Sequence, residues 1–339
     1  MKRPVFQSIT AEKAISLSAA CMKSTLVPAF ILFSFSIAVP AHLFAQSPKP
    51  AGPGAAPVSQ PALTRHYQEG ETIAYKMTGV NQGHQGTIRY EAHAEGVVKK
   101  AASGIFFEEF AWKDLQVNGQ PFALSQASQD LRESVSLAPA FPFAIPDLSK
   151  PQPILIGPIT DLLAFYADTM LSMSQKDLVH AGDHVYVKNG TPNSWADGFR
   201  VVFGQDAIDF DITLQSVDQA AKIATVVVRH VPPAESQIKM PAAWMLTPVG
   251  ASANNWVEVE KGQNGKFTAA VGRETFEADI KISLETGRII SATMDNPVDV
   301  LERECDDAAL TVCGSPVRYG IRRQITLDAD PTTAPNPAK

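Results

Sequence analysis

Long stretches of the chain alternate apolar and polar side chains, which is the pattern of strands with one buried face. Glu71–Val80 and Thr87–Glu95 both alternate in this way, and the glycine-containing segment between them predicts a hairpin. Asn118-Gly119, directly after the strand-like Ile105–Val117, predicts a second hairpin. Further hairpins are predicted at Asn189-Gly190, Asn264-Gly265 and Glu285-Thr286-Gly287. Because connections this short cannot cross over to a parallel neighbour, the pairing should be antiparallel.

One segment has the spacing of a helix instead. Pro158–Ser174 places large apolar side chains three and four residues apart, and a proline suits the first turn. The proline-rich segment before it, Ala138–Pro158, should pass over a surface rather than join a sheet. We therefore predict a mainly β protein, with about ten to twelve strands in an antiparallel curved sheet or half-barrel and at least one amphipathic α-helix packed on it. A β-sandwich is the alternative.

The N-terminal region has the features of an export signal. Leu26–Val39 is apolar and uncharged, too short to span a ~30 Å hydrocarbon core but long enough for the core of a signal peptide. Cleavage after Ala45 would start the mature chain near Gln46, and Met22 is an alternative translation start. We expect residues 1–45 to form the signal-peptide region, 46–66 a proline-rich linker, 67–327 a single β-rich domain and 328–339 a disordered tail.

The cysteines and the charge balance restrict the compartment and the partners. Cys21 precedes the apolar run, so it cannot carry a lipid anchor, and Cys305 and Cys313 are left as a disulfide pair in an oxidising compartment. We expect a periplasmic or secreted protein without a transmembrane anchor after signal cleavage. Lys and Arg number 29 against 35 Asp and Glu, and this net charge of -6 argues against nucleic acid as a partner.

Common enzyme signatures are absent from the sequence. Whether the protein is an enzyme is therefore uncertain, and we favour the interpretation that it is not one. Asp209 and Asp211 should share one face of a strand, ~7 Å apart, as paired carboxylates do in acid-base sites. His184 lies close to His180 and Asp183 in the sequence and is a further catalytic candidate. The alternative for the two aspartates is a sheet with one solvated face, and the alternative for His184 is a strand entry with a polar turn. We expect no metal site and no cofactor.

The candidate ligand-binding residues lie in the helix and in the last strand. Tyr166, Met170 and Met173 fall at helical spacing and could line an apolar pocket, although such residues more often fill a core. Arg323 stands on the apolar face of the strand Val317–Leu327. If Arg323 is buried it needs a carboxylate partner, and otherwise it protects an edge strand from aggregation. We favour the edge interpretation here, with contact to an anionic ligand group as a further possibility.

The order of the expected elements resembles, in architecture alone, the half-barrel carriers of the bacterial periplasm, which hold acyl chains between a curved sheet and helical lids. The resemblance implies a carrier for an apolar or amphiphilic ligand. Without a motif to support that activity, a structural or interaction module of the cell envelope is the first hypothesis, with an envelope protein as its partner. The carrier and a secreted hydrolase or metal-dependent enzyme are the alternatives.

Overall fold

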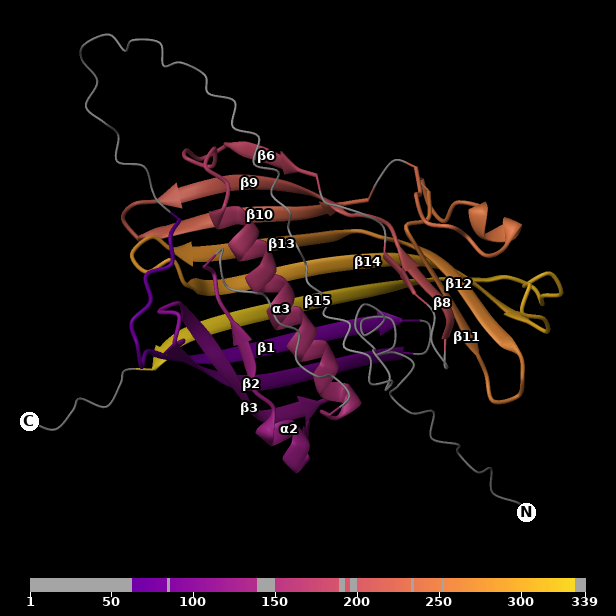
Figure 1. Cartoon of the computed structure of the whole chain (residues 1–339), viewed down its shortest axis with the longest axis horizontal. Helices are drawn as coiled ribbons and strands as arrows, with labels where there is room; N and C mark the ends of the chain where they lie inside the picture. The colour runs from indigo at the N-terminus through magenta and orange to yellow at the C-terminus, as the bar shows by residue number, and fades with distance from the viewer. Residues whose placement is uncertain are drawn as a thin grey trace, which may run out of the picture.

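The computed structural model describes residues 63–83, 86–138, 150–188, 193–195, 200–232, 235–251 and 253–332. Strands dominate it, as the alternating pattern predicts (Figure 1). The strands are β1 (Thr72–Gly83), β2 (Gly86–Lys100), β3 (Phe106–Val117), β4 (Gln120–Phe122), β5 (Glu133–Val135), β6 (His184–Val187), β7 (Asn193–Trp195), β8 (Arg200–Gln205), β9 (Asp209–Asp218), β10 (Ile223–Val231), β11 (Trp256–Lys261), β12 (Phe267–Glu274), β13 (Phe276–Ser283), β14 (Ile289–Cys305) and β15 (Val317–Thr332). The helices are α2 (Gln126–Asp130), α3 (Pro153–Met173) and the 3-10 helix η1 (Ala243–Leu246).

The strands form one antiparallel sheet that does not close into a barrel. Its order is β4-β3-β2-β1-β15-β14-β12-β11-β8-β7, and β13, β10, β9 and β6 branch from β14. The hairpins predicted at Asn118-Gly119, Asn264-Gly265 and Gly287 are confirmed as the β3–β4, β11–β12 and β13–β14 connections. Asn118 and Gly119 have φ angles of 52° and 75°, the positive values that such a tight turn requires. The hairpin expected at Asn189-Gly190 lies outside the described residues.

The branch occurs in the long strand β14. Residues up to Asp295 pair with β13, residues from Val298 onward pair with β12, and β15 accompanies both halves. Pro297 lies between the last β14 residue paired with β13 and the first one paired with β12. A proline has no backbone N–H to donate, and at this position neither of these two ladders needs one. We call β7, β8, β11, β12 and the second half of β14 the wing.

Helix α3 crosses the inner face of the sheet diagonally (Figure 1). It covers the main core, in which Leu155, Ile159, Leu162, Leu163 and Phe165 are all at most 1% exposed. The predicted helix is confirmed, but its predicted start is wrong, because α3 begins at Pro153. The first-turn proline is therefore Pro153, and Pro158 lies inside the helix. By length and composition α3 could cross a membrane, yet most of its apolar stretch is buried inside the molecule.

The wing has a core of its own on the opposite face of β14. Side chains alternate along a strand, so Ala292 and Met294 join the main core under α3, whereas Leu301 and Cys305 face the other way. These two pack with β11, β12 and the loop around Met245. The sheet is thus covered on one face by α3 and on the other, at the wing, by irregular chain.

The described fold includes residues on both sides of the expected domain 67–327. Leu63 and Arg65 are buried, and β15 continues past Leu327 to Thr332, with Ala329 only 2% exposed. Asp328–Thr332, which were expected to belong to a tail, are part of β15, because they continue its alternation opposite β1. The expected signal-peptide region and most of the expected proline-rich linker lie outside the described residues.

Candidate functional site

A buried ion pair fixes the middle of α3 to the centre of the sheet. Asp161 of α3 accepts hydrogen bonds from Arg323 of β15 and from the Tyr90 hydroxyl of β2, the latter at 2.9 Å. Arg323 also donates to the side-chain oxygen of Asn296 at 3.2 Å. The edge interpretation of Arg323 is wrong, because β15 pairs with β1 on one side and β14 on the other. Its guanidinium has the carboxylate partner that a buried arginine needs.

A second cluster joins α3 to the N-terminal strands. The hydroxyls of Tyr75 and Tyr166 lie 2.8 Å and 2.5 Å from the same carboxylate oxygen of Glu108. The other oxygen of Glu108 accepts from Arg65 at 3.0 Å, and Arg65 also pairs with Glu71 at 2.8 Å. Burial and then the charge of Glu108 raise the pKa of the Tyr166 hydroxyl well above its usual value, so Tyr166 stays neutral and donates.

The third cluster lies towards the C-terminal end of α3. Asp168 is 2% exposed and contacts Nε2 of His230 at 3.0 Å and 3.2 Å through its two oxygens. His230 stacks on Phe276 with ring centroids 4.1 Å apart and meets Phe210 edge-on at 4.8 Å. An acid that orients an imidazole is the arrangement of a general base. Among the described residues, no nucleophilic side chain is recorded in contact with Asp168 or His230. Packing of the His230 ring between Phe276 and Phe210 accounts for its position.

The predicted ligand-binding residues are engaged in these clusters or packed against the core, and among the described residues they do not line an apolar pocket. Tyr166 is 3% exposed and committed to Glu108, and Arg323 is committed to Asp161. Met170 and Met173 pack against the main core as partly buried side chains. Because side chains fill the contact between α3 and the sheet, the described residues around α3 have the character of a closed core with polar anchors.

One buried carboxyl is almost without partners. Glu133 of β5 is 1% exposed, and its only described hydrogen bond comes from the indole N–H of Trp112. The second oxygen of Glu133 has no described partner at all. Burial raises the pKa of Glu133 to about 8, and no described charge offsets this effect. At neutral pH the group is therefore mostly protonated.

The catalytic candidates lie together on the outer face of the sheet, near its β6 edge. His184 of β6 is 2.6 Å from Asp211 of the neighbouring β9, and the Tyr186 hydroxyl donates to Asp209 at 2.7 Å. His180 is exposed and stands apart from this group, where its backbone N–H and that of Val179 donate to Asp183. The hydrogen bond from His180 is the main cause that lowers the pKa of Asp183. Cross-strand ion pairs on a solvated face explain the arrangement.

Metal-ligand geometry is not found in the described ranges. No three His, Cys, Asp or Glu side chains there are placed to hold one ion. The loop around Ser194 and Trp195 is described only as the short strand β7.

The tip of the wing combines a disulfide with exposed apolar side chains. Cys305 and Cys313 form a disulfide, which confirms the predicted pair. The loop it closes reaches η1, where the Trp244 indole donates to the Leu310 carbonyl at 3.2 Å and Arg303 lies 5.1 Å above the Trp244 ring. We call η1 together with the loop Cys305–Cys313 the wing tip.

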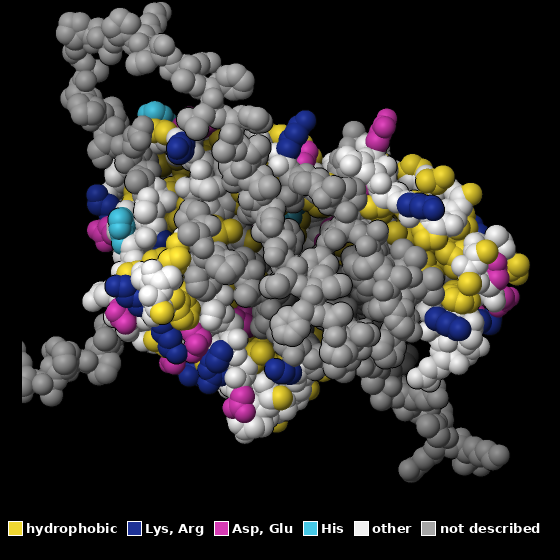
Figure 2. Space-filling model, in the orientation of Figure 1, with side chains coloured by type: hydrophobic (Ala, Val, Ile, Leu, Met, Phe, Trp, Pro, Cys, Tyr) yellow, Lys and Arg dark blue, Asp and Glu magenta, His cyan; other side chains and the backbone are white. Residues whose placement is uncertain are grey.

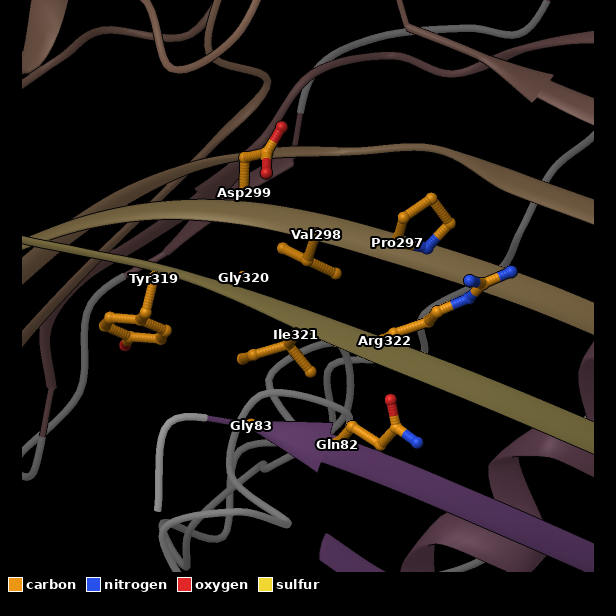
Figure 3. A pocket seen from close by; sticks show the side chains of 9 residues that line it. All are labelled: Gln82, Gly83, Pro297, Val298, Asp299, Tyr319, Gly320, Ile321 and Arg322. Carbon is orange, nitrogen blue, oxygen red and sulfur yellow. The ribbon is translucent and has the colours of Figure 1, made fainter. Parts of the chain in front are cut away.

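A hollow of about 390 Å³ lies between the end of β1 and the paired strands β14 and β15 (Figure 3). Val298, Tyr319 and Ile321 give it apolar walls, and Gln82, Asp299 and Arg322 stand around it. The Tyr319 hydroxyl donates to Glu302 at 2.9 Å. The hollow is open to the outside, and α3 contributes no residue to it.

Sequence reasoning missed the acidic anchors of α3, although a signal was present. Asp161 and Asp168 are seven residues apart, which places both on one face of a helix that is otherwise apolar there. Glu108 and Glu133 carried no such signal, because alternation in β3 and β5 does not reveal which side of the sheet is covered.

Comparison with known proteins assigns this chain to no family. No protein-family model matches it, and no curated protein matches it. What the chain does therefore has to be argued from the geometry above.

Proposed function

We propose that this protein is an exported component of the cell envelope that acts as an interaction module, with a partner protein bound at the wing tip and the adjoining start of β15. The disulfide between Cys305 and Cys313 is compatible with an oxidising compartment, where such bonds persist. The packing under α3 supports a module whose interior is structural and whose binding surface is external.

The exposed apolar side chains of the wing tip and of the adjoining start of β15 carry this proposal. Leu246 is 68% exposed, Val312 is 58% exposed and Val317 is 53% exposed, three of the five most exposed large apolar residues described. Figure 2 shows hydrophobic side chains gathered at that end of the molecule, with Lys and Arg beside them. Apolar groups that stay in contact with water on a rigid scaffold are typical of protein interaction sites.

The alternatives have less support. A carrier needs an apolar space beside α3, whereas Leu163 and its neighbours are packed there. A hydrolase using Asp209, Asp211 and His184 would need these groups to face a substrate cleft, whereas His184 and Tyr186 stand half-exposed on the outer face.

The test is site-specific photo-crosslinking in intact cells of the native host. A photoreactive amino acid at Leu246 should give a discrete adduct with one partner, and Val317 should give an adduct with the same partner. Lys76, exposed on the outer face of β1, is the matched control position and should give none. The Leu246→Glu variant, probed at Val317, should lose the adduct. Equal labelling at Lys76, or no adduct at either Leu246 or Val317, would refute the proposal.

A further inference from the structure

Strand β15 extends beyond its neighbour β1. The last β1 residue with a partner in β15 is Gln82, opposite Arg322, whereas β15 begins at Val317. On its other side β15 stays paired with β14 back to Val317, opposite Glu302. Among the described residues, the stretch Val317–Ile321 therefore has a strand on one side and none on the other (Figure 3).

The registers show which backbone groups this open side presents. Gly83 and Gly86 are directly opposite each other at the end of the β1–β2 hairpin, and the pair that closes a two-residue hairpin exchanges both backbone hydrogen bonds. Because hydrogen-bonded and non-hydrogen-bonded pairs alternate along an antiparallel ladder, odd-numbered residues of β1 bond to β2 and even-numbered residues bond to β15. Even-numbered residues of β15 then point to β1. Past Arg322 these are Gly320 and Arg318, whose N–H and C=O groups lie where a continuing β1 would have bonded them.

The two faces of this edge differ in chemistry. On the inner face, Val298 and Ile321 line the hollow of about 390 Å³ directly beside the edge. On the outer face, the exposed side chains are Arg318 and Arg322, and Arg322 already pairs with Asp295 at 2.9 Å. A strand added here would place alternate side chains in the hollow and against the arginines.

We propose that the Val317–Ile321 edge of β15 binds an extended segment of a partner protein by strand addition, and that the segment alternates apolar and acidic residues. The edge is ~17 Å long, which suits a short strand. The inference rests on the proposed function and names its partner segment.

The charges favour a different protein over a second copy of this chain. Two copies joined antiparallel at this edge would bring the arginines of both strands together, and like charges opposite each other are unfavourable. Acidic side chains of a different protein would instead meet Arg318 with a complementary charge. A Cβ at Gly320 would lie 3.8 Å from its nearest described neighbour, the Val298 carbonyl, so an alanine fits there without a clash.

The experiment is selection of random decapeptides displayed on phage against the folded, oxidised protein from Gln46 onward. Enriched peptides should alternate apolar and acidic residues. Gly320→Pro removes the N–H that the added strand needs and should weaken binding of the selected peptides by about tenfold or more. Gly320→Ala keeps the N–H and is the matched control, with binding unchanged. Arg318→Glu should weaken the same peptides while leaving the backbone intact, which keeps the test valid if the proline variant unfolds.

Peptides that bind Gly320→Pro and Arg318→Glu as well as the parent, or that show no alternation, would overturn the inference. The same would follow from a selection that enriches nothing. Peptides lost only in Leu246→Glu would place binding on the wing tip, so the proposed function would stand and the strand addition would fail.

Discussion

Replacing Glu133 by glutamine should remove a pH dependence of stability that this one buried carboxyl creates. Glutamine has nearly the same shape as the protonated acid and can still accept the hydrogen bond from Trp112. Because the described surroundings of Glu133 hold no cation that pairs with it, the ionised form has no compensation. The substitution therefore tests desolvation alone.

The sign and the size follow from the two pKa values. The folded protein holds the proton up to about pH 8, whereas the unfolded chain releases it near 4.5. The contribution of Glu133 to stability is thus full below pH 4.5 and is lost as the pH rises towards 8. With ~1.4 kcal/mol for each pKa unit, the loss is at most about 5 kcal/mol. Local opening of the short strand β5 limits this loss of stability, because among the described residues β5 pairs with β3 alone, in the segment around Glu109.

The assay is urea unfolding of both proteins at pH 5 and pH 9, with amide exchange of Ser134 and Val135 as the local readout. Glu133→Gln should lie within about 1 kcal/mol of the parent at pH 5 and exceed it by more at pH 9, where it also slows exchange in β5. Glu109→Gln is the matched control, since Glu109 of β3 pairs with Lys99 at 2.6 Å near the surface. An advantage of Glu133→Gln that is equal at both pH values would refute the reasoning.

Further predictions concern packing, the histidine and the disulfide. Leu163→Ala should cost roughly 2 to 5 kcal/mol in urea unfolding, because Leu163 is 1% exposed in the main core; a loss well under ~1 kcal/mol with altered binding of an apolar dye would favour a lid. His230→Ala should cost about 1 to 3 kcal/mol, since Asp168 is left buried without its partner, and Asp168→Asn in that background should recover part of the loss. Alkylation without reductant should label neither Cys305 nor Cys313, and reduction should speed amide exchange around Leu310 before the main core changes. Quantitative labelling of the unreduced protein would contradict that prediction.

The antiparallel architecture could be predicted because its determinants are local. Alternation sets the strands, and Asn118-Gly119 and Asn264-Gly265 set turns whose backbone angles few other residues adopt. The branching of β14 was not visible in the sequence. The branching arises because β13 pairs with the first half of β14 and β12 with the second half, although the sequence of β14 alternates throughout. Pro297 alone does not specify where the partner changes.

The site was harder to predict, because burial of a polar residue depends on distant chain. Arg323 looked like an edge residue in sequence, and only the placement of β15 between β1 and β14 shows that it is central. Asp209 and Asp211 do share a face as expected, yet their partners His184 and Tyr186 come from a strand far away in the sequence. Such pairings need the register, which local patterns do not give.

The proposed function depends most on the claim that the space between α3 and the sheet is filled by the protein itself. Native mass spectrometry of the mature protein, purified from its host compartment without detergent, tests this claim directly. We predict the mass of the polypeptide with its disulfide and with no lipid or other apolar molecule bound. A stoichiometric apolar ligand that is lost when Leu163 is replaced by tryptophan would contradict it and establish the carrier.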